Sequence, residues 1–190
     1  MRKGYSGRLR IVGGRLRGRR LPVGSAPGLR PTPERVRETV FNWLQPSVVG
    51  AVCLDLFSGS GALGFEALSR GASDICFVER DRRLAMHLKA LAEQFGEKAV
   101  RVVNADAQDF LRRDAQPNDI VFLDPPFRKG LLERVCNTLE ARGWLAAGAM
   151  IYLESEAPLS RLSLPACWHH YREGRAGGVH YGLAVRRSAS

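Results

Sequence analysis

The sequence predicts an α/β protein with a doubly wound, mostly parallel sheet of seven strands. Three observations lead to this fold class. Short apolar runs alternate with amphipathic, helix-like segments from Val52 to Ser155. A glycine-rich stretch, LDLFSGSGALG, joins the first apolar run to the first of these helices. Near the C-terminus two strand-like runs are separated only by a short turn, which indicates an antiparallel pair at the end of the sheet.

The size and composition of the chain are those of a soluble, single-domain protein. It has 190 residues, of which 45% are hydrophobic and 25% are charged. No apolar run reaches the ~20 residues of a membrane span, and no secretory signal is recognisable. We therefore expect a cytoplasmic monomer that does not contact membranes. The four cysteines and four histidines have no metal-ligand spacing, so free, mostly buried thiols and no metal are expected.

The net charge of +10 is concentrated near the N-terminus, where residues 1–33 contain nine Arg or Lys and no acid. In RLRIVGGRLRGRRLPV, arginines alternate with Leu or Ile, which predicts a short β-hairpin that turns at Gly13-Gly14 or near Gly18. An arginine face neutralises phosphates and releases counterions. The candidate nucleic-acid contacts of this arm are Arg8, Arg10, Arg15, Arg17, Arg19 and Arg20. A disordered basic tail and a transit peptide remain as alternatives. We divide the chain into an arm at 1–30 and a main domain at 31–190.

The segment RPTPERVRETVFNWL predicts a helix with Thr32 as its N-cap and Pro33 in its first position. The expected buried face consists of Val36, Val40, Phe41, Trp43 and Leu44. Arg35 and Arg37 fall on the other side of this helix. There they extend the basic surface, and Arg35 joins the candidate nucleic-acid contacts, or they are ordinary solvated charges.

The rest of the chain predicts strands and helices in strict alternation. The expected strands are at residues 52–57, 75–79, 100–104, 120–124 and 149–155, and the expected helices at 62–71, 82–96, about 107–113 and 131–143. The final antiparallel pair is expected around the turn at residues 175–177. Together these elements give the seven strands of the predicted sheet.

The glycine-rich loop indicates a nucleotide-like cofactor. Gly59, Gly61 and Gly64 form a G-x-G-x-x-G pattern that allows a tight turn and close approach of a ligand to the helix start. Asp55, at the end of the preceding strand, places a carboxylate at the mouth of this loop. That charge repels a pyrophosphate but complements the ammonium and sulfonium groups of S-adenosylmethionine. Charge therefore favours S-adenosylmethionine over a dinucleotide.

Two more acids end the next two strands. Glu79 is placed to accept hydrogen bonds from both ribose hydroxyls, although dinucleotide sites use this position too. Asp106 is placed to accept from the adenine amino group. Aspartate at a strand end also serves as a cap or turn former, but three acids at successive strand ends favour a ligand site. The candidate cofactor-binding residues are Asp55, Phe57, Gly59, Ser60, Gly61, Glu79, Arg80, Asp106 and Ala107.

The sequence LDPPF at the end of the fourth strand carries the candidate chemistry. An exocyclic amine on a base is a weak nucleophile because its lone pair is delocalised into the ring. The Asp124 carboxylate and the Pro125 carbonyl can accept both amine hydrogens and localise that lone pair. Pro126 stiffens the loop together with Pro125, and Phe127 offers a face on which an extruded base stacks. An ordinary Asp-Pro turn is the structural alternative.

The segments DLFSGSGALG, VERD, NAD and LDPPF resemble those of class I S-adenosylmethionine-dependent methyltransferases that modify exocyclic amines. The N-terminal half, with RIVGGRLRGRRLPV and RPTPERVRETVFNWL, is similar to the bacterial small-subunit (16S) ribosomal RNA guanine-N2 methyltransferase family. The resemblance covers nearly the whole chain. It implies a Rossmann-like class I methyltransferase fold with a basic hairpin arm, S-adenosylmethionine as cofactor, and 16S ribosomal RNA in the small subunit as partner. It also implies methylation of one guanine, with Asp124 to Phe127 at the base.

Other functions remain open at this stage. The acid-Pro-Pro-aromatic motif also serves adenine-N6 methyltransferases that act on DNA or RNA. An NAD-linked oxidoreductase accounts for the glycines, but not for LDPPF or the arm. An inactive RNA-binding module accounts for the arm, but not for the acids at the strand ends.

Overall fold

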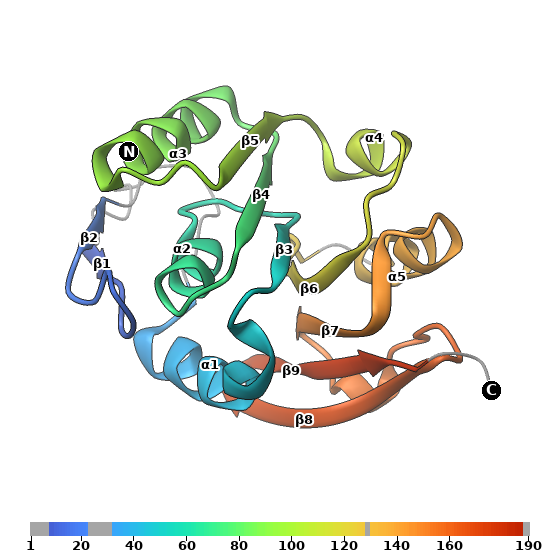
Figure 1. The fold of residues 1–190 in the computed structure, drawn as a ribbon. Helices are drawn as coiled ribbons and strands as arrows, with labels where there is room; N and C mark the ends of the chain where they lie inside the picture. The colour runs from blue at the N-terminus through green and yellow to red at the C-terminus, as the bar shows by residue number, and fades with distance from the viewer. Residues whose placement is uncertain (1–7, 23–31, 128–129, 188–190) are drawn as a thin grey trace, which may run out of the picture.

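The computed structural model describes residues 8–22, 32–127 and 130–187 (Figure 1). Its strands are β1 (Arg8–Arg10), β2 (Arg20–Pro22), β3 (Val52–Asp55), β4 (Asp74–Glu79), β5 (Val100–Asn104), β6 (Asn118–Leu123), β7 (Leu145–Ser155), β8 (Trp168–Ala176) and β9 (Val179–Arg186). Its helices are α1 (Glu34–Val48), α2 (Ala62–Ser69), α3 (Arg82–Phe95), α4 (Ala107–Leu111), α5 (Leu131–Ala141) and the short 3₁₀ helix η1 (Leu159–Arg161). Among these described residues, no helix combines the length and the apolar character needed to cross a membrane.

The centre of the fold is a seven-stranded sheet in the order β5-β4-β3-β6-β7-β9-β8. The strands from β3 to β7 pair in parallel, whereas β9 is antiparallel to both β7 and β8. The predicted α/β class, the seven strands and the C-terminal antiparallel pair are therefore confirmed. The largest difference from the predicted strands is in β7, which begins at Leu145 rather than at Ala149.

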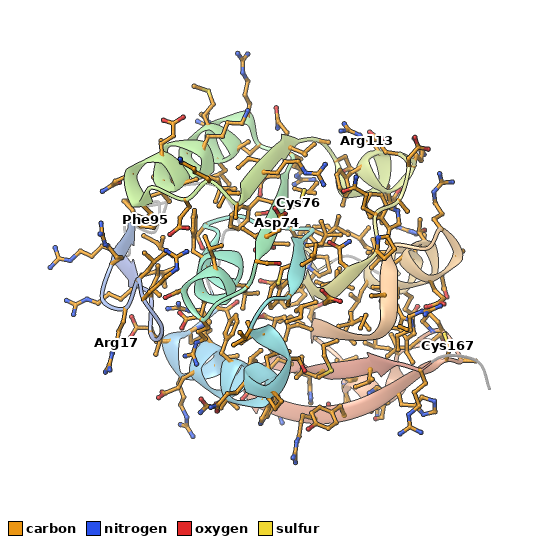
Figure 2. All side chains as sticks on the ribbon, viewed as in Figure 1. Arg17, Asp74, Cys76, Phe95, Arg113 and Cys167 are labelled. Atoms are coloured by element: carbon orange, nitrogen blue, oxygen red, sulfur yellow. The ribbon has the colours of Figure 1, made fainter. Side chains whose placement is uncertain are left out.

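Helices cover both faces of this sheet. Alternate residues of each central strand point to opposite faces, so Cys53 and Phe77 pack in one core cluster and Leu54 and Val78 in the other. The first cluster is closed by α1, α2 and α3, and the second by α4 and α5. Cys76 lies inside the sheet, whereas Arg17 and Arg113 lie at the periphery (Figure 2). The described cysteines are free and, except for the half-buried Cys167, fully buried, as predicted.

The N-terminal basic segment forms the predicted hairpin. β1 and β2 pair antiparallel, with Arg10 opposite Arg20. The strands are shorter than the arginine alternation suggested, because residues 15–18 form a turn between them, and both Gly14 and Gly18 have a positive φ there. Ile11, Leu16 and Leu21 are buried in the same core cluster as α1 and α2. The hairpin is therefore packed on the body of the protein through its apolar side chains.

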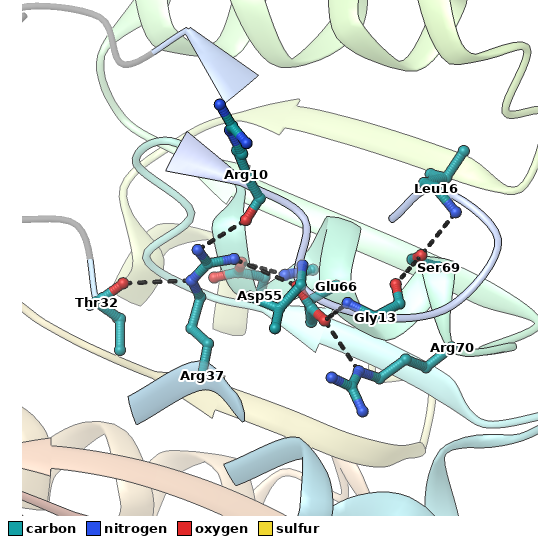
Figure 3. Close-up of polar contacts among 11 residues, drawn as sticks. Arg10, Gly13, Leu16, Thr32, Arg37, Asp55, Glu66, Ser69 and Arg70 are labelled. Carbon is teal, nitrogen blue, oxygen red and sulfur yellow. Dashed lines mark hydrogen bonds and ion pairs between the residues drawn. The ribbon is translucent and has the colours of Figure 1, made fainter. Parts of the chain in front are cut away.

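A buried carboxylate, that of Glu66 in α2, ties the hairpin to two helices (Figure 3). One of its oxygens accepts from the Gly13 backbone N–H and from Arg70 Nε, at 2.8 and 2.9 Å. The other accepts from the Val12 backbone N–H at 2.8 Å and from Arg37 Nη1 at 3.3 Å. Four donors from the hairpin, α1 and α2 thus converge on one side chain, which replaces the hydration that the charge loses on burial.

Two expectations about α1 are wrong. Arg37 is fully buried rather than solvated: its guanidinium pairs with Glu66 and also donates to the carbonyls of Arg10 and Thr32. Burial lowers the pKa of the Arg37 guanidinium below its ordinary value, and the nearby Glu66 charge opposes this shift. Thr32 does not cap the helix, which begins at Glu34 with Pro33 in the N-cap position. The Thr32 hydroxyl instead donates to Glu154 Oε1 at 2.9 Å, and no local sequence pattern predicts this partner.

We expect the substitution Glu66→Gln to destabilise the protein strongly. The amide removes the negative charge and puts a donor where an acceptor is required, so the Arg37 charge is left buried and unpaired. The free energy of unfolding, measured by urea denaturation at pH 7, should fall by about 3–5 kcal/mol. The control is Asp109→Asn, which breaks an exposed ion pair with Arg112 and should change the free energy by about 1 kcal/mol or less. Equal effects of the two substitutions would show that the Glu66 contacts do not hold the fold together.

Candidate active site

A cleft of about 1160 Å³ opens at the carboxyl ends of the parallel strands. The neighbouring strands β3 and β6 mark the point where the connections diverge, because the chain continues from β3 towards β4 and β5 but from β6 towards β7. Such a switch point leaves a crevice at the carboxyl edge of the sheet. The loops that follow β3, β4, β5 and β6 all line it, as does the turn between β8 and β9. The structure therefore gathers the predicted motifs into one cavity.

The three glycines of the loop after β3 have different roles. Gly59 lines the cleft and has a φ of 50°. Gly61 occupies the N-cap position of α2 with a φ of 75°, and it does not line the cleft. A Cβ on Gly64 would lie 2.3 Å from the ring of Phe77, so this glycine allows α2 to pack against β4. Of the three glycines, only Gly59 lies where it can touch a ligand.

Asp55 ends β3 at the floor of the cleft with a buried side chain. Its Oδ2 accepts from the Gly64 backbone N–H at 3.3 Å. Burial raises the pKa of the Asp55 carboxyl from 3.8 to about 7, and the nearby charge of Glu79 adds to the rise, while the backbone N–H of Gly64 opposes it. No Lys or Arg in the described part of the chain forms an ion pair with this carboxyl. A cationic ligand would therefore find a carboxylate without a counterion.

Glu79, the last residue of β4, is held by backbone groups on both sides. Its Oε2 accepts from the Gly59 N–H and its Oε1 from the Asp81 N–H, each at 2.8 Å. Each carboxylate oxygen can accept a second hydrogen bond, so both oxygens keep capacity for a ligand's hydroxyl groups. Arg80 follows Glu79, is exposed and also lines the cleft.

The third acid has a structural role as well. Asp106 is the N-cap of α4, and its Oδ1 accepts from the Gln108 backbone N–H at 2.8 Å. Its side chain is exposed at the rim of the cleft, next to the buried Ala107. Phe57 and Ser60, also predicted for this site, line the cleft on the glycine loop.

The segment LDPPF begins at Leu123, the last residue of β6. Asp124 to Phe127 all line the cavity, and Phe127 is 41% exposed, so a ligand can cover it. Burial raises the pKa of the Asp124 carboxyl well above its ordinary value, and the charge of Glu154 raises it further. The Asp124 side chain and the Pro125 carbonyl are two acceptors on adjacent residues, as the motif predicted.

Sequence reasoning missed Glu154. This residue lies near the end of β7, lines the cleft and is 8% exposed. Its Oε1 accepts from the Tyr152 hydroxyl at 2.6 Å as well as from Thr32. The available signal was an acid inside the apolar run AMIYLES, since an unpaired acid in a buried strand is rarely there for stability.

The predicted arginine contacts lie away from the walls of the cleft. Arg10, Arg17, Arg19, Arg20 and Arg35 are exposed, and the Arg19 guanidinium lies 5.6 Å from the centre of the Phe95 ring. Arg15 is exposed too, but it pairs with Glu97 through both terminal guanidinium nitrogens, so part of its charge is already neutralised. The Arg8 side chain lies outside the described part of the structure. Within the described ranges, no group of His, Cys, Asp and Glu has the arrangement of a metal site.

The buried charge of Asp55 should make stability depend on pH. The carboxyl binds its proton more tightly in the folded protein than in the unfolded chain, so its contribution favours folding at low pH. That contribution is lost as the pH rises from about 4 to about 7, by at most roughly 4 kcal/mol for the rise in pKa from 3.8 to about 7.

Asp55→Asn cannot titrate, so its stability relative to wild type should increase between pH 5 and pH 8 in urea denaturation of the cofactor-free protein. Asp114→Asn, on an exposed side chain, serves as the control and should show no such change. A constant difference between Asp55→Asn and wild type at both pH values would mean that Asp55 ionises normally in the folded state.

Comparison with known proteins places this fold and cleft in a family. The family model described as Conserved hypothetical protein 95 matches residues 9–185. The chain is 53% identical over 184 residues to Ribosomal RNA small subunit methyltransferase D of Escherichia coli K12, covering 96% of this chain and 92% of that protein. The same-named protein of Haemophilus influenzae is 44% identical over 181 residues, covering 93% of both chains.

Solved structures agree with this assignment. The structure named Putative methyltransferase yhhF from Escherichia coli superposes with a TM-score of 0.89 at 51% identity, covering 96% of this chain and all of that one. A putative methylase from Haemophilus influenzae gives a TM-score of 0.81 at 39% identity, covering 96% of this chain and all of that one. The predicted class I methyltransferase fold is thus confirmed. The chain belongs to the family described as Conserved hypothetical protein 95, which is the family of the small-subunit ribosomal RNA methyltransferases that it resembles.

Proposed function

We propose that the protein transfers a methyl group from S-adenosylmethionine to the exocyclic N2 amine of one guanine in 16S ribosomal RNA. The observation that carries this proposal is the cleft itself, which is lined both by the acids after β3, β4 and β5 and by the Asp124-Pro-Pro-Phe127 segment after β6. The acids fit a cationic methyl donor, and the Asp124-Pro-Pro-Phe127 segment fits an aromatic amine. The relatives named as ribosomal RNA small subunit methyltransferases support this choice of reaction and substrate class.

The charges of the cleft fit S-adenosylmethionine better than a dinucleotide. Six acids line the cavity, against two arginines; the acids are Asp55, Glu79, Asp81, Asp106, Asp124 and Glu154. These negative charges would repel a pyrophosphate, whereas they attract an ammonium or a sulfonium group. When bound, S-adenosylmethionine supplies a methyl group activated by the positive sulfur.

The residues of the chain then hold the donor in place. We assign Asp55 to the cationic methionine end, because its carboxylate is buried and without a counterion. Glu79 accepts from the ribose hydroxyls with the lone pairs that the Gly59 and Asp81 N–H groups leave free. Asp106, fixed as a helix cap, accepts from the adenine amino group. The remaining predicted contacts in the cleft are Phe57, Ser60, Arg80 and Ala107, while Gly61 shapes the loop from behind.

Asp124 to Phe127 bind and activate the base. The Asp124 carboxylate and the Pro125 carbonyl accept the amine hydrogens, which orients the nitrogen lone pair towards the methyl group. Pro125 and Pro126 restrict the backbone, so these acceptors need little reorganisation. Phe127 stacks on the extruded base with its exposed ring.

The arginine hairpin is proposed to bind the ribosomal RNA. Arg10, Arg17 and Arg20 are exposed and form no ion pair in the described part of the chain, so they are available to bind phosphates. The exposed Arg19 and Arg35 extend this basic surface. Arg8 and Arg15 belong to the predicted set as well. We keep residues 1–30 as the RNA-binding arm of a methyltransferase domain at 31–190. The protein would act as a cytoplasmic monomer on naked RNA or on the assembled small subunit.

Transfer of labelled methyl groups from S-adenosylmethionine into small-subunit ribosomal RNA, followed by nucleoside analysis, tests the reaction directly. We expect N2-methylguanosine. Asp124→Ala removes an acceptor that acts in the transition state, so turnover should fall by about 10²–10³-fold while cofactor affinity, measured by calorimetry, stays close to wild type. N6-methyladenosine as the product would contradict the proposal and support the alternative function, that of an adenine-N6 methyltransferase. Loss of cofactor binding in Asp124→Ala would remove this residue from the base site.

Salt dependence of RNA binding tests the hairpin. The triple substitution Arg10→Gln, Arg17→Gln and Arg20→Gln should flatten the slope of log affinity against log salt by about 0.7–0.9 for each phosphate that the variant no longer neutralises. Cofactor affinity should not change. The matched control removes three exposed arginines outside the hairpin, Arg112, Arg113 and Arg142; Arg113 lies at the opposite side of the molecule from Arg17 (Figure 2). Identical slopes for the two triple variants would exclude a specific role of the hairpin.

A further inference from the structure

The cleft contains two neighbouring carboxyl groups, those of the half-buried Asp124 and the buried Glu154, and the proposed activation of the amine explains only the first. Leu123, the last residue of β6, pairs with Leu153 of the parallel strand β7. The residues that follow them, Asp124 and Glu154, therefore lie side by side at the same edge of the sheet. Both residues line the cavity.

Glu154 is held rigidly in this position. Its Oε1 accepts from the hydroxyl of Tyr152, two residues earlier on the same face of β7, and from the hydroxyl of Thr32 in front of α1. Both hydroxyls bind the same oxygen, so Oε2 remains available for other partners. This anchoring fixes the side chain without neutralising it, because a hydroxyl carries no charge.

This pair is unfavourable for the stability of the cofactor-free protein. No Lys or Arg forms an ion pair with either carboxyl in the part of the chain that the structure describes. Burial raises the pKa of the Asp124 carboxyl well above its ordinary value, and the neighbouring charge of Glu154 raises it further. Such an arrangement indicates that the pair serves a ligand.

The hydrogen-bonding edge of guanine fits two adjacent acceptors. Guanine carries its N1–H directly beside its N2 amine, so two neighbouring donors point in one direction. Adenine carries its amine beside an unprotonated N1, which is an acceptor. Ionised carboxyls only accept hydrogen bonds, so a second carboxylate next to Asp124 complements guanine and repels the N1 lone pair of adenine.

We propose that Glu154 is the residue that selects guanine, its carboxylate accepting from N1–H of the target base while Asp124 accepts from the adjacent N2 amine. The inference rests on the proposed function, because it concerns the base that enters the same cleft. It gives Glu154 a task distinct from that of Asp124. Asp124 activates the amine of any suitable base, and Glu154 decides which base is accepted.

The test uses an RNA substrate in which the guanosine that the wild-type enzyme methylates is replaced by 2-aminopurine riboside. This analogue keeps the amine at position 2 but has no hydrogen on N1. For wild type, we expect kcat/KM on the analogue to be about 10- to 100-fold lower than on guanosine, as for loss of a hydrogen bond to a charged group. For Glu154→Gln, the preference should shrink to about threefold or less, because the amide can accept from N1–H or donate to N1.

The change in this preference between enzymes is the diagnostic quantity, because any intrinsic difference between the two amines cancels in the ratio. Glu156→Gln, on the exposed neighbouring side chain outside the cleft, is the matched control and should keep the wild-type preference. Calorimetric binding of S-adenosylmethionine verifies that each variant is folded. If Glu154→Gln does not fold, Tyr152→Phe takes its place, since it removes one of the two hydroxyl anchors and should reduce the preference partially.

The outcomes separate this inference from the function on which it rests. N2-methylguanosine as product together with a preference that Glu154→Gln leaves unchanged would overturn the role of Glu154 alone. Equal rates of wild type on guanosine and on the analogue would do the same. N6-methyladenosine as the wild-type product would overturn the guanine-N2 assignment, and the selection of guanine with it.

Discussion

The fold depends on the requirement that the buried carboxylate of Glu66 be fully hydrogen-bonded. Its four donors are two consecutive backbone N–H groups of the hairpin, Arg37 of α1 and Arg70 directly after α2. Removing such a group from water is unfavourable by several kcal/mol unless every lone pair finds a partner. The hairpin, α1 and α2 must therefore be in place together. α2 also begins directly after the glycine loop, so the same contacts fix one wall of the cleft.

Further hydrogen bonds connect the Glu66 contacts to Glu154 in the cleft. Arg37 donates to the carbonyl of Thr32, and the Thr32 hydroxyl donates to Glu154. A chain of hydrogen bonds thus runs from the hairpin backbone to a carboxyl group in the cleft, through side chains that are all buried. These hydrogen bonds fix the positions of the segment before α1 and of the end of β7 relative to the hairpin.

The sequence predicted the sheet, the order of its elements along the chain and the motif residues at the strand ends, because these follow from local periodicity and from local motifs. It did not predict the residues whose partners are distant along the chain. Arg37 has the helical position of a solvated charge, and only the tertiary fold brings Glu66, 29 residues away, beside it. Thr32 has the sequence of a helix cap, yet its partner Glu154 lies 122 residues further on. Gly61 and Gly64 matched a ligand motif, although packing against Phe65 and Phe77 accounts for both.

The way in which the hairpin is attached has a consequence for binding kinetics and thermodynamics. Basic arms that fold on contact with RNA lose conformational entropy at that moment, which weakens the complex. Here Ile11, Leu16 and Leu21 are already buried, and the backbone of the turn is already bonded to Ser69 and Glu66. The ordering is completed when the protein folds. If the hairpin binds RNA as proposed, its described residues 8–22 need no folding step on association, and less of the binding energy is lost to ordering them.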